Sequence, residues 1–509
     1  MSKKSQSHSA QEISTYEFPS PAGFTDPSRR EKIMRAFPEI HRVLQEYRDE
    51  QHIPGLALGI VMDNELVHVD ALGVREVETN APVTNETVFR IASMSKSFVA
   101  MAILKLRDEK KLRLDQRVAK YIPELKTLRY PTSDAPELTL RYLLTMSPGF
   151  PEDNPWGDRQ MAIGEREFTK WLRAGIPFSN APNVTFEYSN YAYAILGRIV
   201  TRVSGMTFQK YITKCLLKPL GMNATVWEKT RVPSETIALG YRWEDEQHKV
   251  EPILADGAFA GMAGLWTTIP DFARYMNFLL DAFPPRDDTE RGPVKRATAR
   301  EMQQMMRYEE LVERKTKGDA SWRAVSGYGF GLAVWHDEHF GYGVAHGGGL
   351  PGYGSYFYFL PHHGVGLVVF ANKFYAGVGR LFPQLLELLA QTGGLEARTV
   401  QPARVLEELR GVAQRWLDGS ADDELIARAA DNFFLDRDLE HRRAELEKIR
   451  ADIGAQVRVG EMEALNALRG KWRMDCERGW IDVLLTLAPT MPPTIQMLTL
   501  TMGKPEESK

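Results

Sequence analysis

Patterns of apolar and polar positions divide this chain of 509 residues into a long first part and a short second part. From about residue 29 apolar side chains recur at helical spacing, namely Ile33, Met34, Phe37, Ile40, Val43, Leu44 and Tyr47. Two strand-like runs follow, "GLALGIVM" and "ELVHVDALGV". They are joined at Asp63-Asn64, which predicts a β-hairpin.

Strand signals return late in the first part, as "GYGFGLAVWH", "GYGVAHG", "GSYFYFL" and "GVGLVVFAN". Between the two groups of strands lie helical patterns near residues 94–110, 190–204 and 269–282, and loops rich in Pro, Gly and Asn over 147–186. Strands at both ends with helices between them predict an α/β (α+β) fold. We expect an antiparallel sheet flanked by helices, with a helical subdomain.

Past Gly394 the pattern changes to the amphipathic runs "QPARVLEELRGVAQRWLDG" and "DDELIARAADNFFLDRDLEHRRAELEKIRADIG". The strand-like "KWRMDCERGWIDVLLTLAP" and "TIQMLTLTM" follow them. We therefore expect a flexible leader over 1–28, a main domain over 29–394 and a small C-terminal α+β domain over 396–509. The C-terminal domain carries no catalytic constellation in its sequence.

Composition narrows the classes of partner. A formal net charge of −3 gives no electrostatic reason to expect nucleic acid or an anionic membrane as partner. The two cysteines, Cys215 and Cys476, have neither metal-ligand nor redox spacing. No apolar h-region follows the early lysines, and no apolar window is long enough to span a bilayer. We predict a cytoplasmic protein without membrane attachment.

Candidate chemistry begins in "FRIASMSKSFVAMAIL", which contains Ser93-Met94-Ser95-Lys96. On a helix, side chains three apart lie on one face, so the Lys96 amine is expected beside the Ser93 hydroxyl. A lysine in a partly dry site has a lowered pKa and accepts the proton of an alcohol nucleophile. Serines also cap helices, so this spacing alone does not decide between a cap and a nucleophile.

A second candidate group is Tyr188-Ser189-Asn190, directly before a helical pattern. A phenol beside a cationic lysine is a possible base toward the serine and acid toward the leaving group. The chain holds a second Tyr-x-Asn, Tyr275-Met276-Asn277, but it falls inside the helical "DFARYMNFLL". Spacing alone therefore does not assign the first copy.

A third candidate group is His346-Gly347-Gly348, at the end of a predicted strand. Glycines let the backbone approach a substrate closely, and the amide of Gly349 is a candidate oxyanion donor beside that of Ser93.

Other histidines offer alternatives that the sequence disfavours. His339 and His362 begin two further His-x-Gly copies, in predicted hairpin turns. The pairs His336/His339 and His362/His363 have no carboxylate or cysteine at ligand-like spacing, so we expect no metal. An α/β-hydrolase would need Gly-x-Ser-x-Gly downstream of "HGGG", and no serine in the chain has that context.

The order Ser-x-x-Lys, Tyr-x-Asn, His-x-Gly resembles the superfamily of serine hydrolases formed by class C β-lactamases and penicillin-binding proteins. Longer stretches resemble it in the same order: "LTLRYLLTMSPGFP", "FEYSNYAYAILGRIVTRVSGMTFQKYI", "KPLGMNAT" and "GLWTTIPDFARYM". The resemblance covers about residues 30–394 and implies the sheet-and-helix fold of β-lactamases and transpeptidases. The C-terminal part more loosely resembles an NTF2-like fold.

The resemblance implies roles for individual residues. Ser93 would be the acylated nucleophile, Lys96 its partner, Tyr188 the general base and acid, and Asn190 a polar support. His346 would take the place of the cation in the third motif.

The resemblance implies no cofactor, and the substrate would be a small molecule. Gly348 and Gly349 are expected to bind it. The aromatic residues Trp156 and Tyr353 are expected either in an acyl pocket or in the core.

One departure from the superfamily bears on function. Its β-lactamases and transpeptidases usually carry Lys-Thr-Gly where this chain has His346-Gly347-Gly348. A substrate carboxylate would lose a cation and a hydrogen bond there. The His-x-Gly form resembles the esterases and D-aminopeptidases of the superfamily.

We therefore expect an esterase-like serine hydrolase that cleaves a small ester or amide. A β-lactamase or D-amino-acid peptidase with the same residues, and a non-catalytic binding protein, stay as alternatives. The sequence also leaves open whether the chain forms an oligomer through its C-terminal domain.

Overall fold

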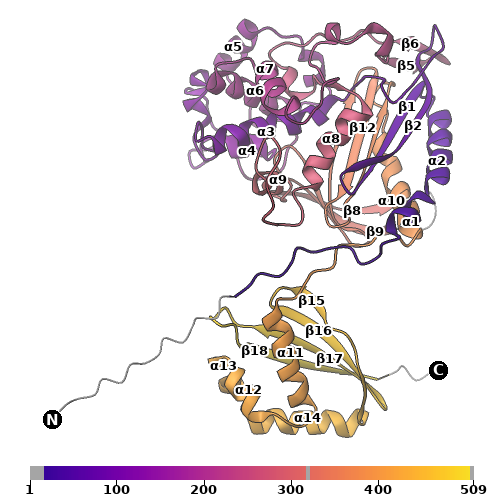
Figure 1. Ribbon diagram of the computed structural model, residues 1–509. Helices are drawn as coiled ribbons and strands as arrows, with labels where there is room; N and C mark the ends of the chain where they lie inside the picture. Colours follow the sequence, from indigo (N-terminus) through magenta and orange to yellow (C-terminus); the bar gives the residue numbers. More distant parts are fainter. Residues whose placement is uncertain (1–15, 317–320, 505–509) are drawn as a thin grey trace. The chain divides into compact units, whose positions relative to one another are not determined.

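The computed structural model describes residues 16–316 and 321–504, in two compact units (Figure 1). One unit is Asp26–Ala397; the other comprises the described residues of Met1–Thr25 and Arg398–Lys509. Residues 1–15 of the predicted leader lie outside the described part. Within the leader, Gly23 exchanges two backbone hydrogen bonds with Thr399, so this point of the chain is held in place. The domain limits drawn from the sequence stay a prediction.

Nine strands form one antiparallel sheet among the described residues of the larger unit, in the order β3-β2-β1-β13-β12-β11-β10-β9-β8. Their bounds are β1 (Gly55–Met62), β2 (Glu65–Glu76), β3 (Ala81–Pro82), β8 (Arg307–Lys315), β9 (Ser321–Tyr328), β10 (Ala333–Asp337), β11 (Gly341–Leu350), β12 (Tyr353–Leu360) and β13 (Val365–Ala371).

The sheet joins the two ends of the unit, because β1 pairs with β13 in a register that opposes Leu56 to Ala371. Asp63 and Asn64 form the predicted hairpin turn, each with a positive φ. The predicted fold of an antiparallel sheet closed by N- and C-terminal strands is confirmed.

The sequence did not predict β8 or most of β9, because the predicted run "GYGFGLAVWH" begins only at Gly327. Strand β8 reads "RYEELVERK" and lies at the sheet edge, where most of its side chains are exposed. An edge strand of this kind has no buried face, so it carries no alternation of apolar and polar residues to detect.

Helices cover both faces of the sheet. They are α1 (Arg29–Met34), α2 (Phe37–Glu50), α3 (Ser95–Asp108), α4 (Leu140–Leu144), α5 (Glu165–Ala174), α6 (Asn190–Ser204), α7 (Phe208–Ile212), α8 (Ile269–Leu280), α9 (Arg296–Met302) and α10 (Phe382–Gln391). Helices α2 and α10 pack with Leu56, Leu58 and Ile60 of β1 on one face. The other face, with Ala57 and Val61, packs against the helical subdomain that includes α3, α6 and α8 (Figure 1).

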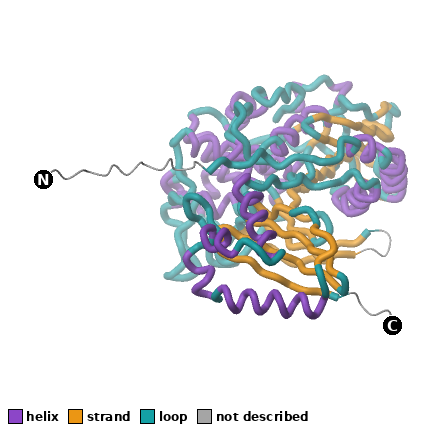
Figure 2. Tube along the Cα trace, turned by 60° about the horizontal axis from the view of Figure 1, so that its bottom comes forward, coloured by secondary structure: helices purple, strands orange, loops and turns teal. Residues whose placement is uncertain are grey.

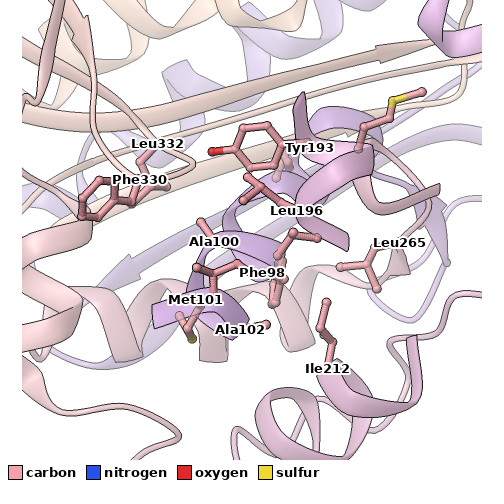
Figure 3. Close-up of a cluster of buried hydrophobic side chains, with 14 of the residues drawn as sticks. Phe98, Ala100, Met101, Ala102, Tyr193, Leu196, Ile212, Leu265, Phe330 and Leu332 are labelled. Atoms are coloured by element: carbon pink, nitrogen blue, oxygen red, sulfur yellow. The ribbon is translucent and has the colours of Figure 1, made fainter. Parts of the chain in front are cut away.

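Helix α3 is the centre of the helical subdomain. Apolar side chains on all its sides are buried, which is typical of a helix surrounded by protein. Figure 3 shows Phe98 and Met101 of α3 among Leu196, Ile212 and Leu265, which come from three other segments. This packing fixes the position of α3 and of the turn that leads into it.

Two small antiparallel pairs complete the larger unit. Strand β4 (Phe89–Arg90) pairs with β7 (Trp266–Thr267), and β5 (Tyr241–Glu244) pairs with β6 (Gln247–Val250).

The smaller unit is an antiparallel sheet with helices on one face. Its strands are β14 (Gln456–Val459), β15 (Glu463–Asn466), β16 (Arg469–Cys476), β17 (Gly479–Leu487) and β18 (Ile495–Gly503). Its helices are α11 (Arg404–Leu417), α12 (Asp422–Arg428), α13 (Asp431–Asp436) and α14 (Leu439–Ile453).

Alternate residues of β16 and β17 are buried, and they pack on apolar side chains of the helices. Figure 2 separates these strands from the helices by colour. The predicted α+β character is confirmed, and the NTF2-like resemblance stays a prediction. Across the part of the chain that the structure describes, none of the helices is long and apolar enough to cross a membrane.

Candidate active site

Ser93 lies in a short 3-10 helix, Ala92–Met94, directly before α3. Two hydrogen bonds hold the turn in front of it: the amide of Ile91 donates to the carbonyl of Leu265 at 3.0 Å, and the Ser355 hydroxyl donates to the carbonyl of Ile91 at 2.8 Å. Ala92 has a φ of 50°, a conformation that costs a non-glycine residue about 1 kcal/mol or more. The surrounding sheet and helices thus impose the position of Ser93.

The neighbouring serines of the motif have structural roles. The amide of Leu265 donates to the Ser95 hydroxyl at 3.0 Å, and the Ser97 hydroxyl donates to the carbonyl of Met94 at 2.8 Å. Both side chains are buried and already bonded within the protein. Ser93 differs from them because it lines a pocket.

Lys96 is fully buried and has three hydrogen-bond partners. Its Nζ lies 3.0 Å from Ser93 Oγ, 2.7 Å from Asn190 Oδ1 and 2.9 Å from the carbonyl oxygen of Met262. The amide and carbonyl oxygens only accept hydrogen bonds, whereas the serine hydroxyl accepts or donates. A neutral amine has two N–H groups and one lone pair, so it fits these partners with its lone pair facing Ser93.

Burial lowers the pKa of Lys96 from its usual 10.5 to about 7, against the opposing fields of Asp158 and Asp153. The ammonium is disfavoured because it has lost its hydration and none of its hydrogen-bond partners in the described structure is a carboxylate. At neutral pH a substantial fraction of Lys96 is therefore the neutral amine, with a lone pair beside the Ser93 hydroxyl.

Tyr188 is the other titratable group at Ser93. Burial raises the pKa of its phenol well above the usual 10, and a hydrogen bond with Ser93 lowers it only in part. The Lys96 Nζ lies 4.9 Å from the centroid of the Tyr188 ring. Tyr188 is therefore a neutral phenol at neutral pH.

Asn190 is positioned by the start of α6. The Ser189 hydroxyl caps this helix by accepting from the amide of Ala192 at 3.1 Å. The Asp153 carboxylate accepts from the amides of Asn190 and Tyr191, each at 2.7 Å. Asn190 Nδ2 donates to Asn154 Oδ1 at 2.7 Å, which leaves Oδ1 for Lys96.

His346 is neutral rather than cationic. Burial, together with the field of Lys96, lowers its pKa to about 3, while the hydrogen bond to Gly347 raises it. Nδ1 lies 2.6 Å from the Gly347 carbonyl oxygen, which requires the proton on Nδ1; Nε2 then accepts from the Tyr328 hydroxyl at 2.8 Å. The sequence placed His346 where relatives have a cation. In the structure its ring is uncharged, and both ring nitrogens form hydrogen bonds within the protein.

The candidate residues meet at a pocket of about 400 Å³. It is lined by Ser93, Asn154, Asp158, Phe186, Tyr188, Glu309, Tyr328, Ala333, His346, Gly347, Gly348, Gly349 and Tyr375. Lys96 and Asn190 lie behind this lining: Lys96 hydrogen-bonds Ser93, and Asn190 hydrogen-bonds Asn154. The three sequence motifs, which run from Ser93 to His346 in the chain, therefore come together at one site.

Gly348 and Gly349 lie in the pocket wall on β11, opposite Ser355 and Gly354 of β12. A second cavity of about 460 Å³ shares Gly347, Gly348, Gly349 and Tyr375 with the pocket.

A Cβ at Gly348 would lie 2.3 Å from the carbonyl oxygen of Ile91, and one at Gly349 would lie 2.7 Å from the Tyr375 ring. The role of these amides as oxyanion donors stays a prediction.

Two expected pocket residues lie elsewhere. Tyr353 is buried against Trp266, at 5.5 Å between ring centroids, and its hydroxyl donates to the carbonyl of Ala238. Trp156 is 47% exposed and packs on Trp171 and Phe259. Neither residue is among the described residues that line the pocket: Tyr353 occupies the core, as the second interpretation expected, and Trp156 is half-exposed, which neither interpretation expected.

Sequence reasoning missed Asp158, Glu309, Tyr328 and Tyr375. Tyr328 and Tyr375 stand in Gly- and Asn-containing stretches at strand ends, which is a weak signal for a site. Asp158 lies in the loop region before α5 and Glu309 on the unpredicted β8, so neither had a motif to mark it.

The excluded motif copies lie away from the pocket. Tyr275 is inside α8, stacked on Phe98, and Asn277 donates to the carbonyl of Asn64 at 2.9 Å. His339 follows β10 and bonds Glu387, and His362 lies in the turn between β12 and β13. Over 16–316 and 321–504, no three His, Cys, Asp or Glu side chains form a group suited to a metal ion.

Comparison with known proteins agrees with the geometry. The family model described as Beta-lactamase matches residues 40–391. "Protein flp" of Staphylococcus aureus (strain COL) is 27% identical over 343 residues, which are 66% of this chain and 62% of that protein. "Beta-lactamase-like protein 2" of Dictyostelium discoideum is 27% identical over 260 residues, 50% of this chain and 47% of that protein.

Among solved structures, the octameric penicillin-binding protein homologue from Pyrococcus abyssi matches with a TM-score of 0.57. The match covers 93% of this chain and 91% of the other, at 21% identity. At this identity the likeness establishes the fold.

Proposed function

This chain belongs to the beta-lactamase family, whose members are generally serine hydrolases that act through an acyl-enzyme, and on that premise we propose that it cleaves a small ester or amide with Ser93 as nucleophile. The observation that carries the proposal is the surroundings of Lys96. Its Nζ has two partners that only accept and one, Ser93, that donates once the amine is neutral.

In acylation, Lys96 accepts the proton of Ser93 while the serine oxygen attacks the substrate carbonyl carbon. This assignment departs from the expectation that Tyr188 is the base. A phenol whose pKa is raised by burial does not hold the negative charge that a base would need, whereas neutral Lys96 has its lone pair in place.

Tyr188 then acts as a proton carrier. Its hydroxyl bonds Ser93, and it passes a proton from the Lys96 ammonium to the leaving group as the carbon–heteroatom bond breaks. In deacylation the same groups run in reverse, with water as nucleophile and Ser93 as leaving group. The amides of Ser93 and Gly349 are the proposed donors to the oxyanion.

Ester or amide substrates are favoured over β-lactams because the pocket lacks a partner for a carboxylate. His346 carries no charge at neutral pH. Among the described residues that line the pocket, none is lysine or arginine. A β-lactam carboxylate would therefore lose its hydration without a compensating cation. D-Amino-acid amides carry no carboxylate at this position and remain a second candidate class.

The test is intact-mass spectrometry after incubation with a fluorophosphonate probe, followed by turnover of p-nitrophenyl esters, D-amino-acid anilides and nitrocefin. We expect one adduct on the parent protein, none on Ser93→Ala, and a full adduct on the control Ser97→Ala. An unlabelled parent protein would favour the non-catalytic binding protein, and nitrocefin turnover equal to ester turnover would favour a β-lactamase.

The assembly of the chain is a separate proposal. The Pyrococcus abyssi homologue is described as octameric. We propose that this chain also self-associates, with the C-terminal unit as the contact predicted from the sequence. Light scattering coupled to size-exclusion chromatography would measure the mass, and a monomer at micromolar concentration would contradict the proposal. The cytoplasmic location stays a prediction.

A further inference from the structure

The active-site pocket has an unbalanced charge. Asp158 and Glu309 line it, and the described part of its lining contains no lysine or arginine. Among the described residues, no ion pair joins either carboxylate to a lysine or arginine; Asp158 accepts from Tyr375 and Glu309 accepts from Ser326. A carboxylate in this position is able to form a strong, charge-assisted hydrogen bond with a positively charged group of a ligand.

Asp158 is the buried member of this pair, at 2% exposure. Its Oδ2 accepts from the Tyr375 hydroxyl at 2.6 Å, and its Oδ1 has no hydrogen-bond partner within the described structure. A buried carboxylate oxygen without a hydrogen-bond donor is unfavourable, so the unpaired Oδ1 of this pocket-lining residue indicates a missing donor. Burial raises the pKa of Asp158, as expected for a carboxyl that lacks a counter-charge.

Glu309, the second carboxylate that lines the pocket, lies on the edge strand β8. The register of β8 against β9 shifts between Tyr308 and Glu310, so Glu309 is the extra residue of a β-bulge. Bulges beside active sites redirect a side chain. Glu309 Oε2 accepts from the Ser326 hydroxyl at 3.1 Å, and its neighbour Glu310 does not line the pocket.

The reaction itself increases this imbalance. In the charged form of Lys96, its ammonium lowers the pKa of Asp158 more than Arg159 does, and Asp158 in turn raises the pKa of Lys96. The reactive form has a neutral Lys96. The pocket is therefore most negative in the state that attacks the substrate, and a cation on the substrate replaces the charge that Lys96 has lost.

We propose that this pocket selects esters or amides that carry a positively charged amino group, with Asp158 as the buried partner of the ammonium and Glu309 as a second carboxylate. The inference names the substrate class of the proposed hydrolase and rests on that function for the reaction, but not for the binding. Amino-acid esters and amides belong to this class.

The first measurement is binding to the Ser93→Ala variant, which needs no turnover. Isothermal titration compares glycinamide with propanamide and β-alaninamide with butanamide, because each pair differs only by an ammonium in place of a methyl group. We expect the cationic member of at least one pair to bind about tenfold more tightly or better. Equal affinity in both pairs, or preference for the neutral members, would overturn the inference.

The second measurement assigns the residues. Asp158→Asn keeps a group that accepts from Tyr375, and Glu309→Gln keeps one that accepts from Ser326, but both remove the charge. In the Ser93→Ala background each is expected to reduce the charge preference by about threefold or more, and Glu310→Gln is the matched control that retains it. A preference unchanged in both variants would contradict the assignment.

The third measurement links binding to the reaction. The kcat/KM of the parent protein is compared for p-nitrophenyl esters of glycine and propanoic acid, each divided by the rate of hydroxide-catalysed hydrolysis of the same ester. A corrected preference for the glycine ester supports the inference. Charge discrimination in binding to Ser93→Ala, together with no acyl-enzyme on the parent protein, would refute the proposed function alone.

Discussion

Tyr188-Ser189-Asn190 and Tyr275-Met276-Asn277 have the same spacing in the chain and opposite surroundings in the structure. The first pair lies at the start of α6, where Asn190 accepts from Lys96 and Tyr188 bonds Ser93. The second pair lies within α8, where Tyr275 stacks on Phe98 and Asn277 bonds a backbone carbonyl.

Burial does not distinguish the two tyrosines, because it raises the pKa of both phenols. The difference is the lysine. Each phenol has a serine neighbour, Ser93 for Tyr188 and Ser97 for Tyr275, but Lys96 lies beside Tyr188, whereas Tyr275 packs on aromatic rings. We therefore expect the reactivity of the site to depend on the contact between Tyr188 and Lys96, and not on the burial of a tyrosine side chain.

The substitution Lys96→Met removes the amine from this contact, and we expect it to have the largest effect on kcat/KM. Without the amine no group accepts the Ser93 proton, so kcat/KM on an activated ester should fall by about 10³–10⁴-fold. Lys105→Met, two turns further along α3, is the control, because Lys105 bonds the Pro293 carbonyl outside the site. More than a tenth of the parent activity in Lys96→Met would disprove the role of Lys96.

The second effect separates the tyrosines directly. Tyr188→Phe removes the proton carrier and should lower kcat/KM by about 10²-fold. Tyr275→Phe should leave kcat/KM within about twofold, with a change in unfolding free energy of about 1 kcal/mol or less. The comparison fails if the two variants lose activity equally, as measured by ester hydrolysis alongside thermal unfolding.

The third effect concerns the asparagines. Asn190→Ala removes an acceptor of Lys96 and should reduce kcat/KM by about tenfold, since the lysine amine is then less well oriented. Asn277→Ala removes only the bond to Asn64 on an exposed surface and should change kcat/KM by less than twofold. Steady-state kinetics of the two variants side by side would check this, and comparable losses would refute it.

The smallest effect is a shift in pH dependence. The reactive form has neutral Lys96, so kcat/KM should rise as pH increases through about 7 and then level off. The field of Asp158 raises the pKa of Lys96, so Asp158→Asn should move this limb to lower pH, with a rate change within about threefold at pH 7 on a neutral ester. If the rising part of the pH profile stays in place or moves to higher pH, the influence of Asp158 on the pKa of Lys96 is contradicted. Glu310→Gln is the control and should leave the pH profile unchanged.

The main features of the fold were predictable because they follow from local patterns of apolar and polar residues. Strands β1, β12 and β13 are buried apolar runs, and α3, α6 and α8 show helical periodicity that matches their observed bounds closely. Strand β8 was not predictable, since its side chains are mostly exposed and its position depends on pairing with β9.

The site divides in the same way. Ser93, Lys96, Tyr188 and His346 belong to short motifs and could be selected from the sequence, together with Asn190. Asp158 could not be selected from the sequence. It stands out because its buried Oδ1 has no hydrogen-bond partner within the described structure, and only the three-dimensional packing shows this. Trp156 and Tyr353 show the converse, since their size fits both a pocket wall and a core and only packing decides.

The glycines of β11 form a wall without side chains between the pocket and the second cavity, which share Gly347, Gly348 and Gly349. The space that a methyl group would need is already taken, at Gly348 by a backbone oxygen that cannot move away and at Gly349 by an aromatic ring that can. Tolerance to substitution should therefore differ between adjacent positions: Gly348 admits no other residue, whereas Gly349→Ala is open to compensation at Tyr375. Paired substitution of Gly349 and Tyr375 therefore offers a way to reshape the wall of the pocket without changing Ser93 or Lys96.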